Sequence, residues 1–299
     1  MPEGHTVHRV AGYFRDQLVG HRVTVSSPQG RFSQGAKTLD GLAILDATAV
    51  GKQLFVTFER GSVLRVHLGI YGAWTFLSHA RHHSMGAPRA SREEGMNASE
   101  VVDFPPEPVG QVRVRIATDD VVADLRGPTA CEVITEEDAQ AIRDTLGPDP
   151  LVDSPAKGLK RFRERMSATK TPVALALMNQ NIVAGIGNVY RAEILFRHRL
   201  DPYAPANALP DDVIEALWRD WTKLLKDGVK TGVMRTRRDL TAAQRTRSLR
   251  NPRIRYYVYK RQGKACRVCH MPVAMAEMAS RKLYYCPHCQ VEPVGRVSA

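Results

Sequence analysis

Apolar residues near the start of the chain recur at the spacing of one helix face. Val7, Val10, Phe14 and Leu18 form the repeat, and Gly20 stands where a helix C-terminal glycine is expected. Short runs rich in β-branched residues follow, separated by Gly, Asp and Ser, at residues 22–25, 42–47, 53–58, 63–68, 73–77, 112–117 and 121–125. A helix followed by such runs predicts a β-sandwich or a barrel.

The second half of the chain shows helical spacing instead. Residues 79–108 are polar and without periodicity, which predicts a long mobile hairpin loop. Thr135 and Asp138 can cap a helix at residues 139–146, and further helices are expected at 171–178 and 188–198. From Pro210 onward a longer helix is expected, followed by an arginine-rich linker at 235–255; its apolar face comprises Val213, Leu217, Trp221, Leu224 and Leu225.

These patterns describe a multidomain α+β protein. We expect an N-terminal β-sandwich domain with its helix at residues 1–134, a helical domain at 135–250 and a cysteine-containing domain at 251–299. No run approaches the roughly 18 apolar residues of a membrane span, and no apolar signal segment begins the chain. We therefore expect a cytoplasmic location.

The net charge of +12 is concentrated in the second half, where residues 151–299 carry 28 Lys and Arg against 12 Asp and Glu. Such a field attracts phosphate polymers such as nucleic acid, or alternatively an anionic membrane surface. No basic amphipathic helix supports the membrane alternative.

Four of the five cysteines form two Cys-x-x-Cys pairs, Cys266 with Cys269 and Cys286 with Cys289. This spacing is typical of two knuckles that bring four thiolates to one structural Zn²⁺. A closed shell of four thiolates leaves no position for catalysis. His270 and His288 beside the pairs are expected on the surface, and the remaining Cys131 is expected to be a small buried residue.

Basic and aromatic residues surround the knuckles, a mixture suited to gripping a phosphate backbone. Lys260 and Arg261 precede the first pair and are predicted to bind DNA. Gly185 and Gly187 lead into a helix at Asn188 without the strand and third glycine of a dinucleotide site. That turn either brings backbone amides and Asn188 to a phosphate or simply joins two helices tightly.

Several motifs occur together and in order: Met1-Pro2-Glu3-Gly4, Gly51-Lys52, residues 67–72 (His-Leu-Gly-Ile-Tyr-Gly), residues 183–190 (Val-Ala-Gly-Ile-Gly-Asn-Val-Tyr) and the cysteine knuckles. Over essentially the whole chain they resemble the formamidopyrimidine-DNA glycosylase and endonuclease VIII family. The resemblance implies an N-terminal catalytic β-sandwich, a helix-two-turn-helix domain and a C-terminal zinc-ribbon hairpin. It also implies a monomer that acts on double-stranded DNA without a nucleotide cofactor.

Pro2 alone would only indicate that Met1 is removed. A freed proline amine, however, can attack a sugar C1′ and form an iminium ion, and the adjacent Glu3 can protonate the departing sugar oxygen. The resemblance assigns these roles to Pro2 and Glu3. It also assigns Lys52 to the phosphate of the damaged nucleotide and to proton transfer; the alternative is a solvated surface lysine.

Three further sites follow from the resemblance. Arg281 matches the finger arginine that contacts phosphates at the lesion and assists δ-elimination, and Asn188 matches a phosphate-binding asparagine. Ile70 and Tyr71 match the loop that fills the gap left by an everted base. Alternatively they are core residues of a β-turn, and His67 beside them is expected to be structural.

The chain departs from the family at His5-Thr6, where the best-known members read Pro-Glu, so a second N-terminal carboxylate is missing. The segment 124–127 matches the remaining intercalation loop only loosely, and Arg126 receives no role. Gly4 and Tyr71 resemble the endonuclease VIII branch more closely. The preferred function is excision of oxidised pyrimidines followed by β,δ-elimination. Oxidised purines, a noncatalytic zinc-ribbon DNA-binding module and an inactive damage sensor are the alternatives.

Overall fold

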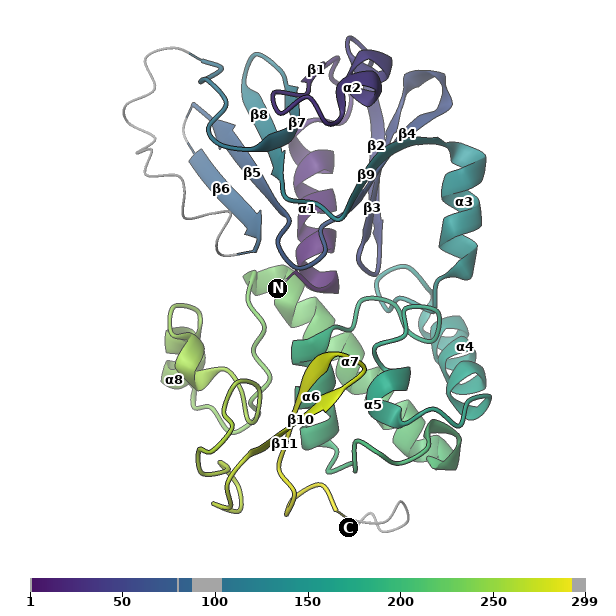
Figure 1. Cartoon of the computed structure of the whole chain (residues 1–299), viewed down its shortest axis with the longest axis vertical. Coiled ribbons are helices and arrows are strands. Elements are labelled where there is room, and N and C mark those ends of the chain that lie inside the picture. The colour runs from purple at the N-terminus through teal and green to yellow at the C-terminus, as the bar shows by residue number, and fades with distance from the viewer. Residues whose placement is uncertain (1, 80, 88–103, 292–299) are drawn as a thin grey trace. The chain divides into compact units, whose positions relative to one another are not determined.

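The computed structural model describes residues 2–79, 81–87 and 104–291. The chain divides into two compact units, Met1–Thr145 and Leu146–Ala299 (Figure 1). The first unit contains both large sheets, and the second contains most of the helices and the hairpin that precedes the last cysteines.

Two antiparallel sheets and the helix α1 (Gly4–Gln17) build the first unit (Figure 1). One sheet has the order β1-β7-β8-β5-β6, and its strands are Thr24–Ser26, Val112–Ala117, Val121–Arg126, Ala73–Ser78 and Arg81–Gly86. The other has the order β2-β3-β4-β9, with Ile44–Val50, Gln53–Phe58, Ser62–His67 and Ala130–Thr135. The predicted β-sandwich with its N-terminal helix is confirmed.

The apolar repeat of α1 faces the common core of the two sheets. Phe14 is fully buried, and its ring lies edge-on to Trp74 and Phe76 at centroid distances of 5.0 and 5.6 Å. Val7 and Val10 are buried in the same cluster. Buried side chains therefore hold α1 against the sheets, and the first residue of its apolar repeat, Val7, lies four residues after Glu3.

The prediction of an irregular loop at 79–108 is wrong for residues 81–86, which form β6 along the edge of β5. This strand is held by backbone pairing from Ser78 opposite Arg81 to Ala73 opposite Gly86. An edge strand needs no apolar alternation, so its polar sequence gave no strand pattern. The middle of the predicted loop, residues 88–103, lies outside the described residues.

Two other elements of the first unit were not predicted, α2 (Ser33–Leu39) and the strand β9. Helix α3 (Glu136–Thr145) confirms the prediction made from Thr135 and Asp138. The Thr135 hydroxyl donates to the Asp138 carboxylate at 2.8 Å and accepts from the Asp138 amide at 3.1 Å.

The second unit consists of helices, with a β-hairpin near its end (Figure 1). Its helices are α4 (Pro155–Ser167), α5 (Val173–Ala176), α6 (Asn188–Arg197), α7 (Asp211–Thr231) and α8 (Ala242–Ser248), and its strands are β10 (Ala274–Met278) and β11 (Arg281–Tyr285). On α7, Leu217, Trp221, Leu224 and Leu225 are buried as predicted, and Val213 is half-buried.

Helix α4 was missed, although Ser154-Pro155 is a typical start signal. The arginine-rich segment 235–255 is not a plain linker, because it contains α8 and a 3₁₀ turn, Pro252–Ile254. A capping box begins α8: the Gln244 amide donates to the Thr241 hydroxyl at 3.3 Å, and the Thr241 amide donates to the Gln244 side chain at 3.1 Å. The Thr-x-x-Gln spacing of this motif is a local signal for the start of α8.

Candidate functional site

Pro2 and Glu3 are both buried at the N-terminus of α1. Glu3 occupies the N-cap position in an extended conformation, and its carbonyl accepts from the Thr6 amide at 2.9 Å. The unpaired amides of a first helical turn create a positive potential that stabilises a carboxylate. The predicted nucleophile and acid therefore lie at a fixed helix start rather than in a frayed terminus.

His5 and Thr6 follow in the first turn of α1, and both are buried. The His5 Nε2 lies 3.3 Å from the Thr6 hydroxyl. Burial, reinforced by the positive charge of Arg9, lowers the pKa of His5 to about 3, so the imidazole is neutral at physiological pH. At the two positions where the resemblance implies Pro-Glu, this chain therefore has a neutral imidazole and a hydroxyl.

Lys52 lies in the two-residue turn that joins β2 to β3, where Val50 pairs with Gln53. Gly51 precedes it with a φ of 58°, a conformation that favours glycine at the first position of such turns. Lys52 is half-buried. The pKa of His67 is lowered first by burial of its ring and second by the positive charge of Lys52. His67 is thus a half-buried neutral residue close to Lys52, and the lysine is not simply a solvated charge.

Ile70 and Tyr71 project from the loop between β4 and β5, with exposed fractions of 47% and 67%. The alternative that they are core residues is therefore wrong. Gly69 has a φ of 63°, and an added Cβ would lie 1.8 Å from the Thr129 hydroxyl. Glycine is required here because the loop passes so close to residue 129.

Asn188 is buried at the first position of α6, where its side chain contacts the hairpin β10–β11. Its amide nitrogen donates to the Lys282 carbonyl at 2.9 Å. The guanidinium of Arg191 donates to the Asn188 side-chain oxygen and, at 3.2 Å, to the same carbonyl. Arg281, one residue before Lys282, is exposed at the start of β11. The structure thus places two predicted site residues of the second unit on adjoining segments.

Glu193 was missed by sequence reasoning, although its carboxylate accepts four hydrogen bonds. It is fully buried on α6 and accepts from the backbone amides of Tyr257, Val258 and Tyr259, each at 2.8 Å. The Thr236 hydroxyl also donates to it. Glu193 fixes the start of residues 256–291, which we call the cysteine module, on the helix that begins with Asn188.

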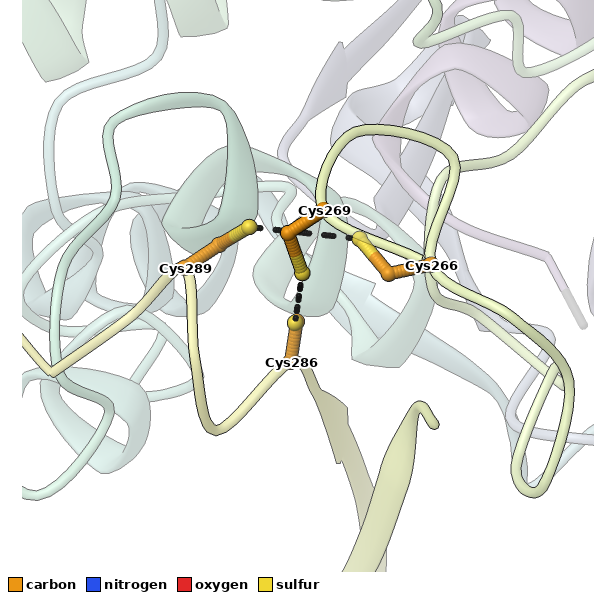
Figure 2. A group of neighbouring side chains, drawn as sticks. All are labelled: Cys266, Cys269, Cys286 and Cys289. Carbon is orange, nitrogen blue, oxygen red and sulfur yellow. Dashed lines mark hydrogen bonds between the residues drawn. The ribbon is translucent and has the colours of Figure 1, made fainter. Parts of the chain in front are cut away.

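The four predicted ligand cysteines converge from the two knuckles, Cys266 and Cys269 on one loop and Cys286 and Cys289 after β11 (Figure 2). Their sulfur atoms lie within 4.8 Å of one another, with 3.4 Å between Cys269 and Cys286 and 3.9 Å between Cys266 and Cys289. A tetrahedral zinc ion with Zn–S bonds of about 2.3 Å requires sulfur separations of about 3.8 Å. The thiol arrangement therefore fits one zinc ion.

Lys260 and Arg261 precede the first knuckle. Lys260 is exposed, and its ammonium lies 5.7 Å from the centre of the Tyr259 ring. Arg261 is half-buried and donates to the carbonyls of Tyr257 and, at 2.8 Å, Ala265. Arg261 thus stabilises the turn that leads to Cys266, and Lys260 is the more accessible of the two cations.

Several smaller expectations can be compared with the structure. His270 and His288 are exposed, as predicted, whereas Cys131 is only half-buried. Arg126, which had no assigned role, is buried and donates to Thr75, Asp124 and the Val109 carbonyl. Among the helices that the structure describes, none is both long and apolar enough to cross a membrane.

Family patterns match the chain in three consecutive parts. Residues 1–128 match the formamidopyrimidine-DNA glycosylase N-terminal domain, residues 146–239 the formamidopyrimidine-DNA glycosylase H2TH domain, and residues 263–291 the zinc finger found in FPG and IleRS. The solved structure of MutM (Fpg) from Thermus thermophilus has the same fold, with a TM-score of 0.70, 24% identity and coverage of 98% of this chain and 100% of that chain. The fold and its cysteine finger define the class of H2TH DNA glycosylases.

Full-length relatives refine this assignment. Endonuclease 8 1 of Mycobacterium tuberculosis (strain ATCC 25618 / H37Rv) is 39% identical over 293 residues, which cover 97% of this chain and 100% of the relative. Probable endonuclease 8 2 of Streptomyces coelicolor is 31% identical over 307 residues, covering 99% and 96%. The chain therefore belongs to the formamidopyrimidine-DNA glycosylase and endonuclease 8 family, whose members are DNA glycosylases in DNA repair.

Proposed function

We propose that the protein is a bifunctional DNA glycosylase and abasic-site lyase that removes oxidised bases, pyrimidines in particular, from double-stranded DNA. The observation that carries the proposal is the buried Pro2-Glu3 pair at the fixed start of α1. The relatives at 39% and 31% identity bear the name endonuclease 8, which favours that branch. A formamidopyrimidine-DNA glycosylase of Methylobacillus flagellatus is 27% identical over 288 residues.

In the proposed reaction, removal of Met1 frees the secondary amine of Pro2. The amine attacks C1′ of the damaged nucleotide as the bond from C1′ to the base breaks, and the proton that the amine nitrogen loses passes to the departing base. Glu3 then protonates the ring oxygen, the bond from C1′ to that oxygen breaks, and an iminium ion joins Pro2 to the opened sugar. Because the iminium acidifies the C2′ proton, loss of this proton expels the 3′ phosphate, and a second elimination expels the 5′ phosphate.

The other predicted residues hold DNA in this proposal. Lys52 contacts the phosphate of the damaged nucleotide and assists proton transfer, and Arg281 and Asn188 contact phosphates near the lesion. Ile70 and Tyr71 enter the gap left by the everted base, which their exposure at the tip of a loop supports. Solved relatives support a DNA partner, since one of them is a complex between the Lactococcus lactis Fpg and an abasic site containing DNA, with a TM-score of 0.72 and 21% identity.

The thiolates of Cys266, Cys269, Cys286 and Cys289 would hold one zinc ion. When bound, the ion supplies a cross-link between the two knuckles and thereby stabilises the cysteine module. It takes no part in the reaction, which belongs to residues of the first unit and to the phosphate contacts of Asn188 and Arg281.

End-labelled duplexes that each carry thymine glycol, 5-hydroxyuracil, 8-oxoguanine, uracil or an abasic site test the proposal. We expect excision of the two oxidised pyrimidines and product ends with phosphates on both sides of the gap. Glu3→Gln should reduce base excision at least about 100-fold, in the range of general acid catalysis. Asp16→Asn, which removes an exposed carboxylate from the same helix, should change little. Excision of 8-oxoguanine alone would contradict the assignment to oxidised pyrimidines. Intact strands on every substrate would contradict the proposed glycosylase and lyase activity.

A further inference from the structure

The arginine-rich segment 235–255 contains eight arginines that divide into two groups. Four of them are used within the second unit. Arg235 pairs with Asp227 at 3.0 Å, Arg237 with Asp239 at 3.0 Å and Arg238 with Asp220 at 3.1 Å, and Arg255 donates to the carbonyls of Ser248 and Leu249 at 2.7 and 2.6 Å. These contacts fold the segment.

The other four, Arg245, Arg247, Arg250 and Arg253, are exposed on α8 and the turn that follows it. Throughout the part of the chain that the structure describes, none of these guanidinium groups forms an ion pair. We call them the arginine platform. Nearby carboxylates are instead paired with the arginines that fold the segment, so the charge of the platform is not neutralised locally.

The platform is held in a defined conformation. The Thr241–Gln244 capping box fixes the start of α8, and the Arg235 guanidinium donates to the Arg245 carbonyl at 3.2 Å. Arg267, in the first cysteine knuckle, donates to the Arg253 carbonyl at 2.9 Å. The four exposed arginines therefore lie on a folded support that is joined to the cysteine module.

A folded cluster of unpaired arginines is suited to a phosphate backbone. The guanidinium group presents donors in a planar fork that matches phosphate oxygens, and neutralised phosphates release condensed counterions. Because the support is already ordered, less conformational entropy is lost on binding than from a flexible arginine-rich linker. Arg238 shows that exposure alone does not define the platform, because its side chain is 55% exposed and still pairs with Asp220.

We propose that the arginine platform is a second DNA-binding surface, which grips backbone phosphates separately from those assigned to Lys52, Asn188 and Arg281. The inference rests on the proposed function in that its partner is the DNA that carries the lesion. The platform reads no bases, since its contacts are to phosphates, and it supplies affinity at physiological salt.

The salt dependence of binding to an abasic-site duplex tests this surface. A variant with Arg245, Arg247, Arg250 and Arg253 all replaced by Gln should lower the slope of log affinity against log salt by about 2 to 4, because each phosphate contact contributes about 0.9. Binding at 0.15 M salt should weaken at least about tenfold. Replacement of the same residues by Lys should largely restore the slope. The matched control replaces four exposed lysines of the same unit, Lys157, Lys170, Lys226 and Lys230, by Gln.

Each result separates the platform from the proposed reaction. Retained borohydride trapping at saturating DNA with a reduced slope supports the platform and shows that the catalytic residues still work. The platform is overturned as a DNA-binding surface if the slope of log affinity against log salt is unchanged in the Gln variant. It is also overturned if the lysine control loses the same amount of slope. Binding of an acidic protein to this surface would not alter either conclusion. If the wild-type protein fails to trap abasic DNA but the slopes still differ, the reaction is contradicted and the platform stands. The zinc content and melting temperature of each variant verify that it is folded.

Discussion

In the N-terminal unit an apolar core shared by α1 and both sheets positions the predicted chemical groups, whereas the cysteine module depends on buried polar groups. Phe14 of α1, the helix that begins after Pro2 and Glu3, packs against Trp74 and Phe76 of β5. The cysteine module contacts α6 through Glu193 and Asn188, together with a smaller apolar cluster. We expect the first arrangement to tolerate changes in salt and metal, and the second to depend on its hydrogen bonds and on a zinc ion bound by the four cysteines.

Metal removal should produce the largest difference between the two regions. A structural zinc site in a small module contributes on the order of 10 kcal/mol, so a strong chelator should unfold the cysteine module and leave the sandwich folded. Limited proteolysis followed by mass spectrometry checks this, with cleavage expected first in residues 256–291. Equal protection of the module with and without metal would contradict a structural zinc.

Truncation of the apolar core should affect the sandwich alone. Phe14→Ala removes a fully buried ring and should lower the free energy of unfolding by about 3–5 kcal/mol. Urea unfolding measured for the N-terminal unit gives this value. Leu45→Ala, at a side chain with 56% exposure on β2, is the control and should change stability by less than about 0.5 kcal/mol. Similar losses of unfolding free energy in both variants would contradict the role of Phe14 in the core of the sandwich.

Loss of the Glu193 carboxylate should weaken the polar attachment. Glu193→Gln leaves backbone donors of residues 257–259 without full partners and should lower stability by about 2–4 kcal/mol. Hydrogen exchange should accelerate at those amides, with little change in the sandwich. The control Glu277→Gln alters an exposed carboxylate of β10 in the same module. Unchanged exchange at residues 257–259 would contradict the anchoring role.

Acid should weaken the sandwich through His5. The pKa of His5 is about 3 in the folded protein and 6.5 ordinarily, so between these values the unfolded state binds more protons. The stability associated with the neutral ring is therefore complete above pH 6.5 and decreases as the pH falls, by about 2 kcal/mol at pH 5. His5→Gln should show a shallower loss of stability from pH 7 to pH 5. Parallel pH profiles for the two proteins would contradict a buried neutral His5.

The sequence predicted the elements whose residues alternate or repeat strongly. The strands at 53–58 and 112–117 agree with the structure at both ends, because their β-branched residues are buried in the sandwich. It did not predict β6 or α8. The edge pairing of β6 leaves little local pattern, whereas α8 has the Thr241–Gln244 capping box but no apolar repeat that would identify a helix.

The candidate site shows the same limit. The cysteine spacing predicts a metal site by itself, because four thiolates in two close pairs have few other uses. Pro2, Lys52 and Asn188 carry almost no signal individually, and their assignment came from the order of several motifs. Glu193 was missed because a glutamate in a helical sequence normally indicates a solvent-facing position, and its bonding partners lie more than 40 residues away.

The proposed reaction requires the amine of Pro2 to be the nucleophile. Borohydride reduction during reaction with abasic-site DNA, followed by digestion and mass spectrometry, identifies the residue that carries the sugar. The adduct is expected on the N-terminal peptide at Pro2, after loss of Met1, and Pro2→Gly should greatly reduce its yield. An adduct on Lys52 or another lysine, or full trapping by a protein that retains Met1, would contradict it.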